Sequence, residues 1–191
     1  MELQKLNVKI FTEQPDSVPL ADFIEIFHGW IQATDGVYHD VADYSHMQAG
    51  PGIVLVASDA HVSIDESGDR RGLVFSQKAP LAGSNQEKLR AVLRAALENC
   101  CKLEAEPALR GKLRFAMNET VISLNDRLLG ANSEESFDEI KGDVETVARQ
   151  LFGGAQVSLE RDGDARQRLN VRVTTSASID LPQALNNLSR N

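Results

Sequence analysis

Helix-like segments in this sequence alternate with pairs of short strand-like segments, and this order constrains the fold more than any other feature. Three stretches carry apolar residues at helical spacing, and the apolar runs between them come in pairs joined by turn-forming residues. Strands joined by short turns pair antiparallel, whereas parallel strands need a long crossover connection. The sequence therefore predicts an α+β fold, with an antiparallel or mixed sheet and three main helices that lie largely on one face.

The helix with the clearest signals is predicted to begin at Ser84. Ser84 and Glu87 have the spacing of a capping box, in which each side chain accepts a hydrogen bond from the backbone N–H of the other residue. Apolar residues then recur on one helical face as far as Cys100. The same spacing predicts two more helices, one that begins at residues 17–19 and runs to about Ala33, and one that begins near residues 132–136 and runs to Leu151.

Turn-forming residues divide the predicted strands into hairpins. Such turns lie at residues 66–69, around Asn118 and at residues 161–164, where Gly, Asn and Asp tolerate the backbone conformations of tight turns. We therefore expect one hairpin at each of these three places.

The sequence predicts a single domain followed by a short tail. No linker rich in Pro or Ser divides the chain, so residues 1–175 are expected to form one α+β domain. Residues 176–191 form a polar C-terminal tail, in which Leu181, Leu185 and Leu188 have the spacing of a short helix. A chain of 191 residues is long enough to bury a sizeable core without disulfides.

The charge of the chain limits its expected partners. The net charge is −8, and residues 1–69 contain 12 acidic residues against two lysines. Nucleic acids and anionic membranes gain little from meeting such a surface, so neither is an expected partner. The uneven charge also leaves open a noncatalytic interaction module or a homo-oligomeric structural protein that assembles through its sheet edges.

The cysteines and the N-terminal residues favour a cytoplasmic location. Cys100 and Cys101 are adjacent on a predicted helix, where neighbouring side chains diverge and a disulfide between them would be strained. The first residues lack the basic and apolar regions of a signal peptide. We therefore expect reduced thiols in the cytoplasm.

The densest cluster of polar residues lies between residues 39 and 46, with one more histidine a short strand later. Imidazole and carboxylate groups are ligands of zinc and other divalent metals. The candidate ligands are His39, Asp43, His46 and His61. If residues 37–43 are extended, the alpha carbons of His39 and Asp43 are about 13 Å apart, so joint ligation requires a bend.

Acid–base chemistry is a second interpretation of the same cluster. His46 could act as a general base oriented by Asp43, with Tyr44 donating a hydrogen bond. A solvated turn is the third interpretation, because His, Asp and Ser are common in turns. Gly50-Pro51-Gly52 precedes a strand, where it predicts a tight turn rather than a dinucleotide site.

A group of arginines on the last predicted hairpin is the other candidate. Arg161, Arg166, Arg168 and Arg172 lie within twelve positions of one another, and Arg168, Asn170 and Arg172 share one face of a strand. This group could bind an anionic ligand or the acidic part of the same or another subunit. It could also be the polar decoration of an exposed strand.

Two stretches resemble a family of uncharacterised bacterial proteins of similar length. The first runs from Asp40 to His46 and is followed by Gly50-Pro51-Gly52, and the second is Asn125-Asp126-Arg127-Leu128. The resemblance implies a bacterial cytosolic protein and draws attention to residues 40–52, but it implies no activity.

Together these patterns predict a cytoplasmic protein with a small-molecule or metal site, bordered by the loop from Asp40 to Gly52 and by His61. A divalent metal is the one cofactor that the pattern indicates. Standard catalytic and phosphate-binding motifs are absent from the sequence, so a binding protein and an enzyme both stay open.

Overall fold

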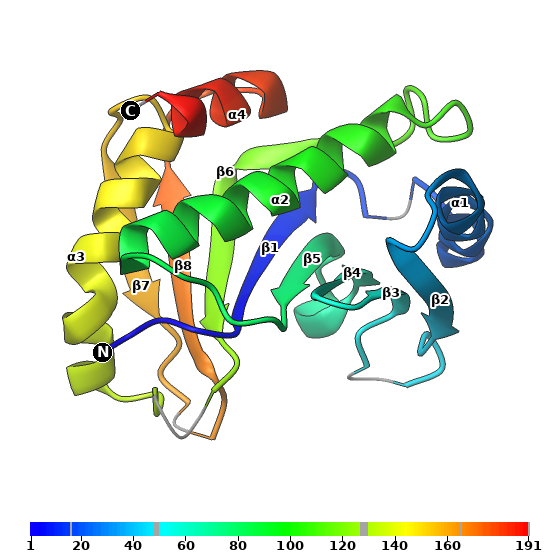
Figure 1. Cartoon of the computed structure of the whole chain (residues 1–191). Coiled ribbons are helices and arrows are strands. Elements are labelled where there is room, and N and C mark those ends of the chain that lie inside the picture. Colours follow the sequence, from blue (N-terminus) through cyan, green and yellow to red (C-terminus); the bar gives the residue numbers. More distant parts are fainter. Residues whose placement is uncertain (16, 48–49, 127–129, 165, 191) are drawn as a thin grey trace.

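The computed structural model describes residues 1–15, 17–47, 50–126, 130–164 and 166–190. In these ranges eight strands form one antiparallel sheet in the order β2-β3-β4-β5-β1-β6-β8-β7 (Figure 1). The strands are β1 (Leu6–Thr12), β2 (Tyr38–Asp43), β3 (Ile53–Ala57), β4 (Ala60–Asp65), β5 (Gly72–Gln77), β6 (Phe115–Leu124), β7 (Val157–Arg161) and β8 (Leu169–Thr175). The helices are α1 (Leu20–Ala33), α2 (Asn85–Ala105), α3 (Glu134–Leu151) and α4 (Leu181–Ser189), with a short 3₁₀ turn at Ser67–Asp69.

Alternation along the strands gives the sheet one apolar face. Val8 on β1 lies opposite Phe75 on β5 and Ile122 on β6, and all three side chains are buried in the main hydrophobic cluster. The residues between them point the other way, because successive side chains of a strand alternate between faces. We call the side that carries Val8 the core face and the opposite side the open face.

The helices cover the core face. The long helix α2 packs against β1 and β5, α1 packs against β2 and β3, and α3 packs against β7 and β8. The C-terminal α4 packs against α2 and α3, and its Leu181, Ala184 and Leu188 join the hydrophobic cluster. The α+β prediction and the predicted C-terminal helix are thus confirmed. Within the described ranges, no helix combines the length and apolar character needed to cross a bilayer.

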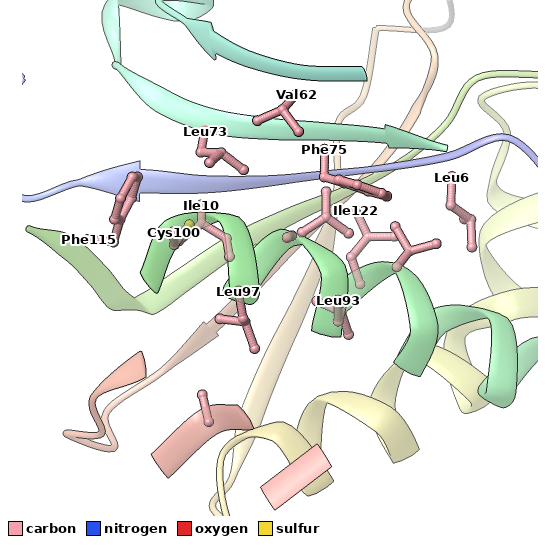
Figure 2. Close-up of a cluster of buried hydrophobic side chains, with 14 of the residues drawn as sticks. Leu6, Ile10, Val62, Leu73, Phe75, Leu93, Leu97, Cys100, Phe115 and Ile122 are labelled. Atoms are coloured by element: carbon pink, nitrogen blue, oxygen red, sulfur yellow. The ribbon is translucent and has the colours of Figure 1, made fainter. Parts of the chain in front are cut away.

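Helix α2 forms where its sequence signals place it. The Ser84 side chain accepts from the backbone N–H of Glu87, and the Glu87 carboxylate accepts from the backbone N–H of Ser84, which confirms the capping box. Leu93, Leu97 and Cys100 of α2 are all buried, and Figure 2 shows Cys100 toward the strands and Leu97 on the opposite side of the helix. Burial raises the pKa of the Cys100 thiol well above its ordinary value, so this thiol is a packing group.

The predicted hairpin around Asn118 is wrong. The chain continues through this position as one strand, β6 (Phe115–Leu124), in the middle of the sheet. Glu119 points from β6 to the open face, where it binds Arg70 and Arg172, and Thr120 donates to the backbone carbonyl of Lys9 at 2.9 Å. Partners from other strands therefore allow polar residues to occupy a central strand.

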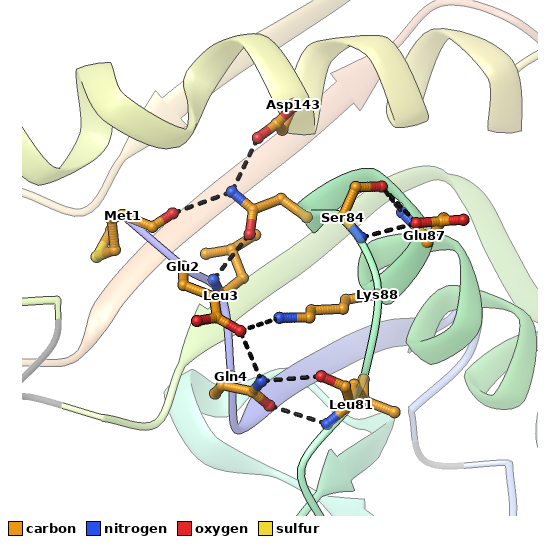
Figure 3. Close-up of polar contacts among 10 residues, drawn as sticks. Met1, Glu2, Leu3, Gln4, Leu81, Ser84, Glu87, Lys88 and Asp143 are labelled. Atoms are coloured by element: carbon orange, nitrogen blue, oxygen red, sulfur yellow. Dashed lines mark hydrogen bonds and ion pairs between the residues drawn. The ribbon is translucent and has the colours of Figure 1, made fainter.

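The N-terminal segment is held against the start of α2 by polar contacts (Figure 3). The Leu3 N–H donates to Asn85 Oδ1 at 2.8 Å, and Asn85 Nδ2 donates to the carbonyl of Met1 at 3.0 Å. Lys88 has only 1% of its surface exposed, yet its ammonium reaches Glu2 at 2.6 Å. The whole Lys88 side chain is thus buried, and the exposed Glu2 supplies the carboxylate that pairs with its ammonium.

A Val→Ala substitution should lower the free energy of unfolding by different amounts on the two faces of the sheet. Val62→Ala removes buried atoms from the core face and is expected to lower the free energy of unfolding by about 2 kcal/mol. Val74→Ala removes the same atoms from the half-buried open face and is expected to cost less than about 1 kcal/mol. Urea unfolding measures both, and equal costs would contradict the assignment of the faces.

Because Glu2 and Lys88 form an ion pair, we expect the free energy of unfolding to depend on pH. Hydrogen bonds from Lys88 and then Gln4 hold the pKa of the Glu2 carboxyl below its ordinary value. The pair therefore stabilises the fold above the unfolded pKa, about 4.3, and this contribution is lost as the pH falls through the folded pKa. Glu2→Gln should therefore lower the free energy of unfolding more at pH 7 than at pH 3. The exposed Glu98→Gln is the control, and an unchanged pH profile for Glu2→Gln would refute the pair.

Candidate functional site

The open face carries a row of polar side chains that crosses five neighbouring strands. Pairing places Asn7 on β1 directly between Ser76 on β5 and Ser123 on β6. Ser76 in turn lies opposite His61 on β4, and Ser123 lies opposite Asn170 on β8. We call these five residues the polar row. Asp40 extends the same line toward the edge of the sheet, since it pairs with Val56, which pairs with His61.

Two atoms of the polar row are buried without a hydrogen-bond partner. They are Asn7 Oδ1 and His61 Nδ1, and Asn7 is only 7% exposed. Ser76 lies between the two residues, and side chains directly opposite on neighbouring strands have Cβ atoms about 4.5–5.5 Å apart. A buried polar atom without a partner costs about 1–3 kcal/mol. The unsatisfied capacity for hydrogen bonding is therefore concentrated at one place in the sheet.

The environment of His61 favours the neutral imidazole. Partial burial and, second, the positive charge of Lys78 lower the pKa of His61 below its ordinary value. A neutral imidazole has one nitrogen that donates and one that accepts. His61 can therefore offer either role to a ligand at neutral pH.

Beside the polar row, the open face carries two groups of paired charges. Lys9 binds Asp65 and donates to the carbonyl of Ser67 at 3.1 Å. Farther along the sheet, Arg70 donates to both oxygens of Glu119, at 2.7 and 3.0 Å, and Arg172 binds the same carboxylate. Hydrogen bonds from Arg70 hold the pKa of Glu119 below its ordinary value. These pairs connect turns and strands that are distant in the sequence.

A hollow of about 280 Å³ opens at the end of the sheet formed by β6, β8 and β7. The lining residues are Val121, Glu160, Arg161, Asp162, Asn170 and Arg172. Asn170 belongs to both the hollow and the polar row, so the two features are continuous. Within the described residues the Nε of Arg161 is a third buried polar atom without a partner.

The arginines predicted as a cluster are only partly brought together. Arg161 and Arg172 line the hollow, and Asn170 shares the open face with Arg172. Arg166 instead binds Asp164 at 3.0 Å within its own turn, and Arg168 lies exposed at the end of β8. Sequence reasoning missed Glu160, Asn7 and Ser76. Their alternation with apolar residues was the available signal, but alternation does not show which polar residues are buried.

The residues predicted around positions 39–46 lie at the edge of the sheet and are exposed. One ring nitrogen of His39, Nε2, lies 2.7 Å from the hydroxyl of Ser58, and Asp43 Oδ1 accepts from the Ser45 N–H at 2.8 Å. The pKa of Asp43 is lowered by hydrogen bonds from Ser45 and, more weakly, by the charge of His46. Tyr44 is 40% exposed. Asp43 and His46 are therefore neighbours in a turn.

The structure does not bring the four predicted metal ligands together. Asp43 pairs with Ile53 and so lies on the core-face side of its strand, whereas His61 lies on the open face. In the described ranges, no group of three or more His, Cys, Asp or Glu side chains is placed to hold a metal ion. Metal binding and acid–base chemistry at this segment stay predictions.

Gly52, after this turn, is required by the conformation of the backbone. Gly52 has a φ of +69°, and a Cβ at this position would lie 2.0 Å from the carbonyl oxygen of Ile64. The Tyr44 N–H donates to the carbonyl of Gly52 at 2.8 Å, which closes the turn between β2 and β3. The tight turn predicted at Gly50-Pro51-Gly52 stays a prediction, because this bond closes the longer connection from Tyr44 to Gly52. Residues 48 and 49 of this loop, and Arg127 and Leu128 of the other resembling stretch, lie outside the described residues.

Comparisons with known proteins identify no relative of this chain. No protein-family model, no curated protein and no solved structure matches the chain.

The charge of Lys78 near His61 predicts that a substitution of Lys78 changes the pKa of His61. Lys78→Gln removes a positive charge near the imidazole, so the pKa of His61 should rise toward its ordinary value of about 6.5. Because the folded pKa is the lower one, neutral His61 stabilises the fold above about pH 6.5 and this contribution fades as the pH falls. Histidine ring NMR signals measure the pKa. The exposed Lys112→Gln is the control, and equal His61 values in both variants would exclude the effect of Lys78.

Proposed function

We propose that this protein is a noncatalytic binding protein that takes a small polar molecule on the open face of its sheet. The observation that carries the proposal is the pair of buried atoms without partners, Asn7 Oδ1 and His61 Nδ1, in one row on that face. A ligand that hydrogen-bonds to both atoms recovers the free energy lost by burying them unpaired.

The polar row defines the chemistry of the ligand. Asn7 Oδ1 can only accept, the Ser76 hydroxyl can donate and accept, and His61 Nδ1 takes either role according to its tautomer. A fitting ligand therefore has at least one N–H or O–H donor and a second polar group within two strand spacings, about 9.6 Å, because β5 lies between β1 and β4. Amides, polyols and amino acids have this character.

The location agrees with part of the site expected from the sequence. His61 borders the polar row, and Asp40, the first residue of the predicted loop, lies on the same line two strands away. We do not propose a divalent metal as the occupant, because Asp43 and His61 lie on opposite faces. We place the protein in the cytoplasm, since Cys100 and Cys101 are both free thiols.

Protein-observed NMR tests the proposal. The ¹⁵N-labelled full chain is titrated with primary amides, polyols, nucleosides and free amino acids at millimolar concentration. At least one probe should shift the backbone amide signals of Asn7, His61 and Ser76 saturably. Ser76→Val, which replaces the hydroxyl in the middle of the row, should weaken that binding about tenfold or more.

The matched control is Ser158→Val, which makes the same exchange on β7, away from the polar row. Binding to this variant should equal binding to the parent protein. The proposal fails if no probe shifts the open face, or if the shifts map to the helices instead.

A further inference from the structure

We propose that the hollow over β6, β8 and β7 binds a compact zwitterion, a free α-amino acid, through Glu160 and Arg172. This inference rests on the proposed function, since it names the ligand class and its anchoring point on the open face. The hollow adjoins the polar row at Asn170. A ligand anchored there can therefore extend toward Ser123 and Asn7.

The charges around the hollow select for a molecule with both signs. Glu160 and Arg172 face each other on the open face and bring one carboxylate and one guanidinium group to the hollow. Arg161 also lines the hollow, but its guanidinium binds Asn132 and Glu134 at the start of α3. A simple anion such as phosphate would meet the carboxylate of Glu160, and a simple cation would meet the guanidinium of Arg172. Like charges at close range are unfavourable, whereas a zwitterion can match each sign with its opposite.

Glu160 is available for an ammonium group. It lies directly opposite Arg172 in the pairing of β7 and β8, yet Arg172 binds Glu119 on the other side. Within the described part of the chain, Glu160 forms no ion pair or hydrogen bond of its own. Its exposed carboxylate is therefore a free acceptor at the edge of the hollow.

Arg172 is available for a carboxylate even though it is paired. A guanidinium carries five N–H donors, and the structure assigns one of those of Arg172 to Glu119. Because Arg70 donates to both oxygens of Glu119, that carboxylate is already shared between two arginines. The remaining donors of Arg172 can bind a ligand carboxylate in the paired geometry that guanidinium groups favour.

The spacing and the size of the hollow fit an α-amino acid. Its ammonium and carboxylate are attached to one carbon atom, and Glu160 and Arg172 are direct cross-strand neighbours whose Cβ atoms are about 4.5–5.5 Å apart. A volume of about 280 Å³ lies at the lower limit of small-molecule sites. Val121 is the one apolar lining residue, so the site favours small side chains over aromatic ones.

Three probes separate a zwitterion site from a site for one charge. L-alanine carries both charges, L-alaninamide lacks the carboxylate and N-acetyl-L-alanine lacks the ammonium. L-alanine should shift the amide signals of Val121, Glu160, Asn170 and Arg172 saturably. Each of the other two probes should bind at least about tenfold more weakly than L-alanine, because each leaves one charged group of the protein without its partner.

Glu160→Gln tests the assignment of the ammonium partner. This exchange keeps the shape of an exposed side chain and removes its charge, so it should weaken L-alanine binding about tenfold while the unfolding temperature stays unchanged. Glu98→Gln, on the solvent side of α2, should bind L-alanine like the parent protein.

The outcomes distinguish this inference from the proposed function. Equal binding of L-alanine and N-acetyl-L-alanine, tighter binding of inorganic phosphate, or an unaffected Glu160→Gln variant would each overturn the zwitterion site. In those cases the proposed function stands if an amide or polyol still shifts Asn7, His61 and Ser76. It falls together with the inference if no probe reaches the open face.

Discussion

The packing of α2 on one face of the sheet is the constraint on which the rest of the structure depends. The buried face of α2 packs against β1 and β5, and the period of two along a strand then directs every other residue away from the helices. Burial on one side thus creates the open face. The polar row lies on that face, and the hollow adjoins it there, so both are consequences of this division.

The junction of β1 and β6 brings the two parts of the chain together. On each side of it, a strand and a helix are followed by antiparallel strands, β2 to β5 on one side and the hairpin of β7 and β8 on the other. The last of these strands returns to pair with the first, β5 with β1 and β8 with β6. Asn7 lies at this junction, between Ser76 from one part and Ser123 from the other. Arg70 crosses the junction to reach Glu119, which also binds Arg172. The same contacts that join the two parts therefore also place the hollow beside the polar row.

Patterns that depend on neighbours in the sequence were predicted correctly. The capping box at Ser84 and the helical spacing of the apolar residues concern contacts within one turn or one face, so they do not need the rest of the fold. The hairpin predicted at Asn118 was wrong because partners of Glu119 come from other strands. The candidate site was predicted in part. His61 and the face shared by Asn170 and Arg172 were identified, but the ligand partners proposed for His61 were separated by strand register.

The sequence by itself determined the helices, the antiparallel class of the sheet and the acidic character of the first 69 residues. It could do so because periodicity, capping and charge are properties of short stretches. Only the tertiary structure decided which strands are neighbours, and therefore that Asn7 is buried beside Ser76 and that Glu160 lies opposite an arginine held by another carboxylate. Pairing between strands distant in the chain depends on the packing of the whole core, and no local pattern in the sequence records it.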